Sequence, residues 1–104
     1  MNGYEPGRIV LSKAGRDKGR AFIIVGSEGP HLLLADGRLR RTEQPKKKKP
    51  MHVFSRPELI TSIQGKLERG ETPQNHEIRQ ALREAGYPAC GKEQEEGEAW
   101  QRAI

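Results

Sequence analysis

Short apolar runs separated by polar turns fill the front half of the chain, a pattern typical of an antiparallel β-meander. Three such runs predict strands over residues 8–13, 20–26 and 31–35. The run from Phe22 to Val25 indicates a strand that is buried on both faces. Asp36 and Gly37 follow the third run and predict a type I′ hairpin, in which both residues take a positive φ, with a return strand over 38–43.

Two further expectations concern the directions of side chains. Strand alternation points Leu39 of the return strand inward and leaves Arg38 and Arg40 together on the opposite face. A short closing strand is predicted over residues 51–54, and we expect the ring of Phe54 in the core.

The spacing of apolar residues changes to a helical period in the second half. Ser55 and Glu58 match a capping box, which predicts a helix that ends at Gly70. The apolar residues of this helix recur at helical spacing and are Leu59, Ile60, Ile63 and Leu67. A second helix is predicted over 77–85, capped by Asn75, and the short link between the helices favours an antiparallel helical hairpin.

The pattern therefore predicts a mainly β fold with C-terminal helices, in one small domain with appendages. We place the β domain in residues 1–56, a helical extension in 57–90 and a disordered acidic tail in 91–104. Apolar residues make up 33% of the 104 residues and charged residues 32%, which predicts a thin core under a heavily charged surface.

Charge is distributed unevenly along the chain. Residues 1–56 hold 13 Lys/Arg and 5 Asp/Glu, a net charge of +8, whereas residues 57–104 hold 6 and 9, a net charge of −3. Because phosphates attract the first segment and repel the second, we expect polyanion binding in the first segment alone.

Membrane and secretory features are missing from the sequence. No apolar run approaches the about 20 residues of a membrane span, and the N-terminus lacks the apolar stretch of a signal peptide. The chain has 1 cysteine, Cys90, so no internal disulfide can form. We expect a cytoplasmic protein that does not engage membranes.

No set of residues matches the pattern of an enzyme or of a metal site. His31, His52 and His76 are far apart, and Cys90 has no second cysteine with which to bind zinc. Ser12 lacks the Gly-x-Ser-x-Gly context of a catalytic nucleophile. We therefore expect no catalysis, no metal and no cofactor.

Basic residues gather in three places of the β domain, and we expect them to bind RNA phosphates, with two loop glycines allowing close approach of the backbone. The candidate residues are Lys13, Gly15, Arg16, Lys18, Gly19, Arg20, Arg38, Arg40, Arg41, Lys46, Lys47, Lys48 and Lys49. Residues 44–50 are expected to form a flexible arm, or alternatively a solubilising linker. With only 1 Trp, 2 Tyr and 2 Phe in the chain, we expect recognition of the phosphates and shape of structured RNA rather than base stacking.

Two motifs resemble the KOW unit, a strand–loop–strand element that binds RNA in several large-subunit ribosomal proteins and also occurs in transcription elongation factors. Residues 15–20 resemble the family's Gly-x-Asp-Lys-Gly-Lys loop, and residues 34–37 resemble the Leu-Val-Asp-Gly hairpin of archaeal and eukaryotic ribosomal members. Phe22 stands where many KOW units carry a further glycine, which fits the ribosomal subgroup. With Lys46–Lys49 and His52, the chain is similar to small bacterial KOW-domain RNA-binding proteins. The resemblance covers about half of the chain and implies an SH3-like antiparallel β-barrel.

The resemblance further implies a non-catalytic protein that engages ribosomal RNA as a ribosomal-like or ribosome-associated factor. We expect a monomer when free, with the helices over 57–90 available to ribosomal proteins. The alternative is a protein-interaction module or a factor of the transcription elongation or termination type. Salt separates the two, because phosphate contacts weaken steeply with salt whereas an apolar protein interface does not.

Overall fold

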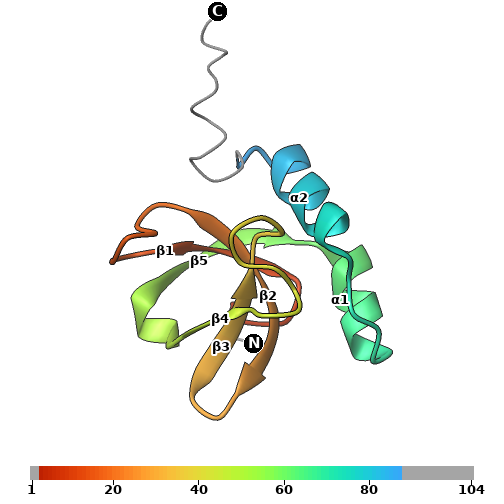
Figure 1. Cartoon of the computed structure of the whole chain (residues 1–104), viewed down its shortest axis with the longest axis horizontal. Helices are drawn as coiled ribbons and strands as arrows, with labels where there is room; N and C mark the ends of the chain where they lie inside the picture. Colours follow the sequence, from red (N-terminus) through yellow and green to blue (C-terminus); the bar gives the residue numbers. More distant parts are fainter. Residues whose placement is uncertain (1–2, 88–104) are drawn as a thin grey trace, which may run out of the picture.

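An antiparallel sheet of five strands forms the centre of the protein and is followed by two helices (Figure 1). The structure is a computed structural model and describes residues 3–87. The strands are β1 (Arg8–Ser12), β2 (Ala21–Glu28), β3 (His31–Ala35), β4 (Lys46–Lys48) and β5 (Val53–Leu59). A turn of 3-10 helix, η1 (Pro50–His52), leads into β5, and the helices are α1 (Thr61–Glu68) and α2 (Asn75–Glu84). The expected antiparallel β fold with C-terminal helices is confirmed, and the expected acidic tail over 91–104 lies outside the described residues.

The strands follow the order β4-β3-β2-β1-β5, and the sheet is open. In the part of the chain that the structure describes, β4 pairs only with β3 and β5 only with β1. The register shifts at a point in each of the pairings β1–β5 and β2–β3, and such bulges bend a sheet. The ammonium group of Lys48 on β4 lies 3.0 Å from the hydroxyl of Ser12 on β1. β4 and β1 are therefore joined by a side-chain contact, although their backbones do not pair.

Alternation along the central strands divides the apolar side chains into two cores. The strand core lies among the strands and contains Val10, Phe22, Ile24, Leu32, Leu34 and Val53. The helix core lies between the sheet and the helices and contains Ile9, Ile23, Ile63, Ile78 and Leu82. Since β2 contributes to both cores, the prediction that its apolar run is buried on both faces is confirmed.

The two helices cover one face of the sheet (Figure 1). Ile63 of α1 and Ile78 of α2 pack with Ile9 and Ile23 of the strands, and all four are buried. Full burial of an isoleucine side chain contributes about 1.5–3 kcal/mol to stability. A fragment ending at residue 56 would therefore uncover apolar surface of the sheet and would also divide β5.

β5 occupies the segment where the sequence predicts the start of the first helix, so the predicted capping box at Ser55 and Glu58 is wrong. β5 pairs with β1, and the guanidinium group of Arg8 donates hydrogen bonds to the carbonyl oxygens of Arg56 (3.3 Å) and Pro57 (3.0 Å). Pro57 is tolerated because β5 is an edge strand, where a backbone N–H is not needed for the ladder. α1 therefore begins only after β5 ends.

The second helix is confirmed, although it begins before the predicted range of 77–85. A capping box forms between Gln74 and Glu77, in which the Glu77 carboxylate accepts a hydrogen bond from the Gln74 N–H at 2.9 Å. Asn75 is the first residue of α2 rather than its cap. Its side-chain oxygen instead accepts a hydrogen bond from the N–H of Thr42 at 2.9 Å.

Residues 36–45 form a loop, which we call the arginine loop, so the return strand predicted over 38–43 is wrong. The partner of β3 is β4, further along the chain. Gly37 has a φ of 80°, but among the described residues only glycines have a positive φ, so Asp36 does not. The type I′ hairpin, which requires a positive φ at Asp36 as well, is therefore also wrong.

The side chain of Asp36 explains why this segment is not a hairpin. Its Oδ1 accepts hydrogen bonds from the N–H groups of Arg38 (2.9 Å) and Arg40 (2.8 Å). Such bonds offer the backbone an alternative to a strand ladder. As a result, Leu39 does not point inward and is 53% exposed. Phe54 on β5 is also 53% exposed, and its expected place in the core is wrong.

Candidate nucleic-acid interface

The basic loop, residues 13–20, joins β1 to β2. Gly15 and Gly19 have φ values of 88° and 85°, in the region that favours glycine. A Cβ on Gly19 would meet nothing within 4 Å, so this glycine is needed for its backbone conformation rather than for space. The exposed cations of the loop are Lys13, Arg16 and Lys18.

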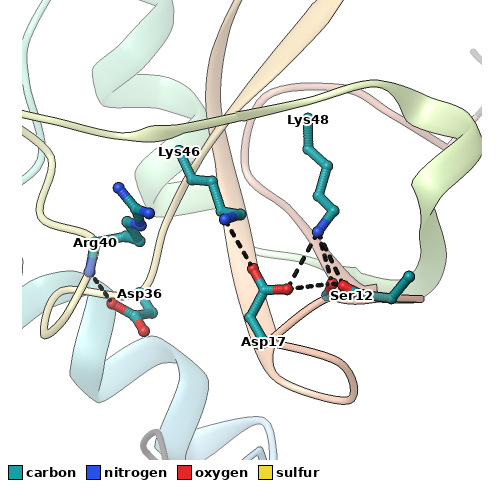
Figure 2. Close-up of polar contacts among 7 residues, drawn as sticks. Ser12, Asp17, Asp36, Arg40, Lys46 and Lys48 are labelled. Carbon is teal, nitrogen blue, oxygen red and sulfur yellow. Dashed lines mark hydrogen bonds and ion pairs between the residues drawn. The ribbon is translucent and has the colours of Figure 1, made fainter.

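Asp17 turns inward from the basic loop, and its side chain is only 8% exposed. The hydroxyl of Ser12 donates a hydrogen bond to Asp17 Oδ1 at 2.8 Å, and the ammonium group of Lys48 donates to the same oxygen at 3.1 Å. Lys46 Nζ forms an ion pair with Asp17 Oδ2 at 3.3 Å (Figure 2). One carboxylate thus joins the basic loop to both β1 and β4.

The pKa of Asp17 reflects opposing effects. Burial raises the pKa, but the hydrogen bonds from Ser12 and Lys48 and the positive charges of Lys46 and Lys48 lower it by more. The net pKa lies below the ordinary value of 3.8, so the carboxylate is ionised at neutral pH and holds both ammonium groups.

The first three lysines of the run 46–49, Lys46–Lys48, form β4 and are part of the sheet, so the predicted flexible arm and the linker alternative are both wrong. Lys46 and Lys48 stand opposite two leucines of the strand core, and Lys47 points to the other face. The Lys48 side chain is 13% exposed, whereas that of Lys47 is 57% exposed and lies 3.2 Å from Glu28. The two inward lysines cover the core with their aliphatic stems and place their charges on Asp17.

A cavity of about 360 Å³ opens between the basic loop and the arginine loop, and we call it the arginine pocket. Its lining residues are Arg16, Asp17, Arg20, Phe22, Asp36, Leu39, Arg40 and Lys46. The cations come from the basic loop, the arginine loop and β4. Of the two carboxylates, Asp17 is engaged with the lysines of β4 and Asp36 with backbone N–H groups.

α2 holds the arginine loop in place. Nη1 of Arg79 donates a hydrogen bond to the carbonyl oxygen of Gly37 at 2.7 Å. Gly37 packs so closely on the helix that a Cβ there would lie 2.5 Å from the carbonyl oxygen of Asn75. The position of Arg40 at the pocket therefore depends on α2 as well as on the strands.

The structure brings four of the predicted RNA-binding side chains to one pocket, namely Arg16, Arg20, Arg40 and Lys46. The other predicted cations do not line it. Lys13 Nζ lies 4.8 Å from the ring centre of Phe54, and Lys47 faces Glu28. Arg41 Nε lies 3.7 Å from Glu43 at an exposed ion pair.

Sequence reasoning missed the hydrogen-bonding roles of Asp17 and Asp36 at the arginine pocket and the exposure of Phe54 outside it. A signal existed for Asp17, because an acid among the cations of a loop that also contains glycines invites an internal ion pair. For Phe54 the pattern gave no such signal, since it follows Val53 in an apolar run and alternation alone does not say which of the two is buried.

Metal ligands, membrane-spanning helices and similarity to known proteins would each bear on the function of the chain. Among residues 3–87, no group of three or more His, Cys, Asp or Glu side chains could hold a metal ion. No helix in this part of the chain is long and apolar enough to cross a membrane. No model of a known protein family matches the chain, and no curated protein is significantly similar to it. The function must therefore be inferred from the pocket and its surroundings.

Proposed function

We propose that this protein is a non-catalytic RNA-binding protein that holds phosphates of structured RNA, and of ribosomal RNA in particular, at the arginine pocket. It would act as a ribosomal-like or ribosome-associated factor. The resemblance of residues 15–20 and 34–37 to the KOW loop and hairpin supports the ribosomal assignment. We also propose that the curved sheet is an SH3-like barrel of the KOW class, in which side chains of β4 and β1 supply the closure.

The observation that carries the proposal is that three arginines line one pocket. Arg16, Arg20 and Arg40 line it together, although Arg40 lies 20 or more positions further along the chain than the other two. In residues 3–87, no carboxylate forms an ion pair with any of the three. Unpaired guanidinium groups that share a pocket repel one another, and an anion such as phosphate relieves this repulsion.

The engagement of Asp17 strengthens the case for a phosphate ligand. A free carboxylate in the pocket would repel phosphate, but Asp17 is held by Ser12, Lys46 and Lys48. Guanidinium groups bind phosphate in a bidentate geometry, and neutralised phosphates release counterions from RNA. The arrangement thus suits the backbone of a nucleic acid and requires no base-specific contact.

Replacing two pocket arginines tests this proposal. We expect the double variant Arg16→Gln/Arg40→Gln to bind a structured ribosomal RNA fragment about 100-fold more weakly at 0.1 M salt, because each of the two lost phosphate contacts removes about tenfold of affinity. The slope of log K against log salt should become shallower by up to about 2. Filter binding over a series of salt concentrations measures both quantities.

The matched control carries the same loss of charge on the helices. The double variant Arg69→Gln/Arg83→Gln removes two exposed arginines that do not line the pocket, and we expect its affinity to stay within about twofold of the parent. Circular dichroism checks that both variants are folded. An equal loss of affinity in both variants would show that binding depends only on the net charge of the protein. An unchanged affinity of the pocket variant would show that the arginine pocket does not bind RNA. Binding of a protein partner with little dependence on salt would favour the transcription-factor or protein-interaction alternative.

A further inference from the structure

An aromatic ring stands exposed at the edge of the sheet beside the root of the basic loop. Phe54 is 53% exposed, although its neighbour Val53 is buried in the strand core. Alternation on β5 turns Phe54 to the face of the sheet that the helices cover. It nevertheless takes no part in the helix core, whose strand residues are centred on Ile9 and Ile23.

The register of the sheet explains why the helices leave this ring uncovered. Phe54 pairs with Leu11, which lies two residues beyond Ile9 toward the basic loop and on the same face. Leu11 is only half-buried and belongs to neither core. The end of this face next to the basic loop is therefore an apolar surface with Phe54 at its edge.

A cation lies directly on this ring. Lys13 Nζ is 4.8 Å from the ring centre, within the range of a cation–π contact. The backbone N–H of Lys13 also donates a hydrogen bond to the carbonyl oxygen of His52 at 2.9 Å, which ties the loop to the segment before β5. An exposed aromatic ring with an ammonium group beside it matches the two parts of a nucleotide, a flat base and a phosphate.

We propose that Phe54 stacks against an unpaired nucleobase of the bound RNA, with Lys13 contacting the phosphate of the same nucleotide. This inference rests on the proposed RNA-binding function. It reverses the expectation that base stacking is absent, which assumed that Phe54 is in the core. A nucleic acid fits better than an apolar protein partner, because the ring is continuous with the basic loop and carries a cation above it. The protein would then recognise a helix with an unpaired nucleotide next to it.

Two RNA probes separate this proposal from general RNA binding. One is a hairpin whose stem carries a single bulged 2-aminopurine nucleotide, and the other is the same hairpin without the bulge. We expect Phe54→Leu to weaken binding of the bulged hairpin about tenfold and to leave the paired hairpin unchanged, since stacking on an aromatic side chain is lost only in the first. Phe54→Trp should retain the affinity for the bulged hairpin. The parent and Phe54→Trp should quench the 2-aminopurine fluorescence, and Phe54→Leu should not.

The outcomes distinguish the failure of this inference from the failure of the proposed function. If the parent binds both hairpins and Phe54→Leu weakens both or neither, or leaves the quenching intact, Phe54 is not a stacking platform while RNA binding stands. If the parent binds neither hairpin nor the ribosomal RNA fragment, both proposals fail. The double variant Arg16→Gln/Arg40→Gln serves as the reference, because it should weaken both hairpins alike.

Discussion

Replacing Gly37 with alanine is expected to lower the free energy of unfolding by about 3 kcal/mol or more, since it combines backbone strain with a steric clash. The φ of Gly37 is 80°, where side chains are disfavoured. A Cβ at this position would also lie 2.5 Å from the carbonyl oxygen of Asn75 and 2.8 Å from Cγ of Arg79. The Asn75 oxygen belongs to the backbone of α2, which cannot move aside as a flexible side chain can. The midpoint and slope of urea unfolding measure the loss.

Gly70 provides a control with almost the same φ. Its φ is 81°, but a Cβ there would meet nothing within 4 Å. Gly70→Ala should therefore show the cost of the left-handed conformation alone, about 1–2 kcal/mol. If Gly37→Ala and Gly70→Ala lose the same amount, the close packing of the arginine loop on α2 does not restrain the fold. Weaker RNA binding by folded Gly37→Ala would show that α2 also positions the pocket.

The second large effect is expected for Asp17→Asn, which should lower the free energy of unfolding at pH 7 by about 2–3 kcal/mol, the contribution of hydrogen bonds to a charged group. The variant keeps the shape of the side chain but loses its charge. Lys46 and Lys48 would then lose their ion pairs with Asp17, although the Lys48 side chain is only 13% exposed. Unfolding in urea, followed by circular dichroism, gives the difference from the parent.

The pH dependence of this difference has a definite sign. The pKa of Asp17 is lowered in the folded state, so its contribution is fully present above the unfolded value near 3.8 and is lost as pH falls through the folded pKa. The parent and Asp17→Asn should therefore converge in stability below pH 3.8. Glu28→Gln is the control, because the exposed pair with Lys47 should change stability by no more than about 1 kcal/mol. A difference that stays constant down to pH 2 would show that the Asp17 charge does not contribute.

The sequence by itself determined the meander and the second helix. β1, β2 and β3 begin and end within two residues of their predicted ranges, because short apolar runs bounded by turn residues have few alternatives to a strand. The amphipathic spacing of Ile78 and Leu82 likewise required a helix that buries one side. The basic loop between β1 and β2 follows from the same pattern, as glycines and cations interrupt two apolar runs.

Only the tertiary structure decided the faces of the edge strands. A run of four identical residues, Lys46–Lys49, contains no alternation from which an inner face could be predicted. The pairing of β4 with β3 determined which side chains of the run face inward. Lys46 and Lys48 can occupy this inner face because both form ion pairs with the buried carboxylate of Asp17. In the same way, the pairing of β5 with β1 chose Val53 for the core and left Phe54 outside.

The arginine pocket also depended on contacts between distant segments. Local preferences favoured a hairpin at Asp36 and Gly37, but the Asp36 side chain bound backbone N–H groups, and α2 packed against Gly37. The contacts of Gly37 with Asn75 and Arg79 of α2 join residues more than 35 positions apart, which no local pattern encodes. The sequence therefore determined which cations are available, whereas long-range packing determined that Arg16 and Arg40 share one pocket.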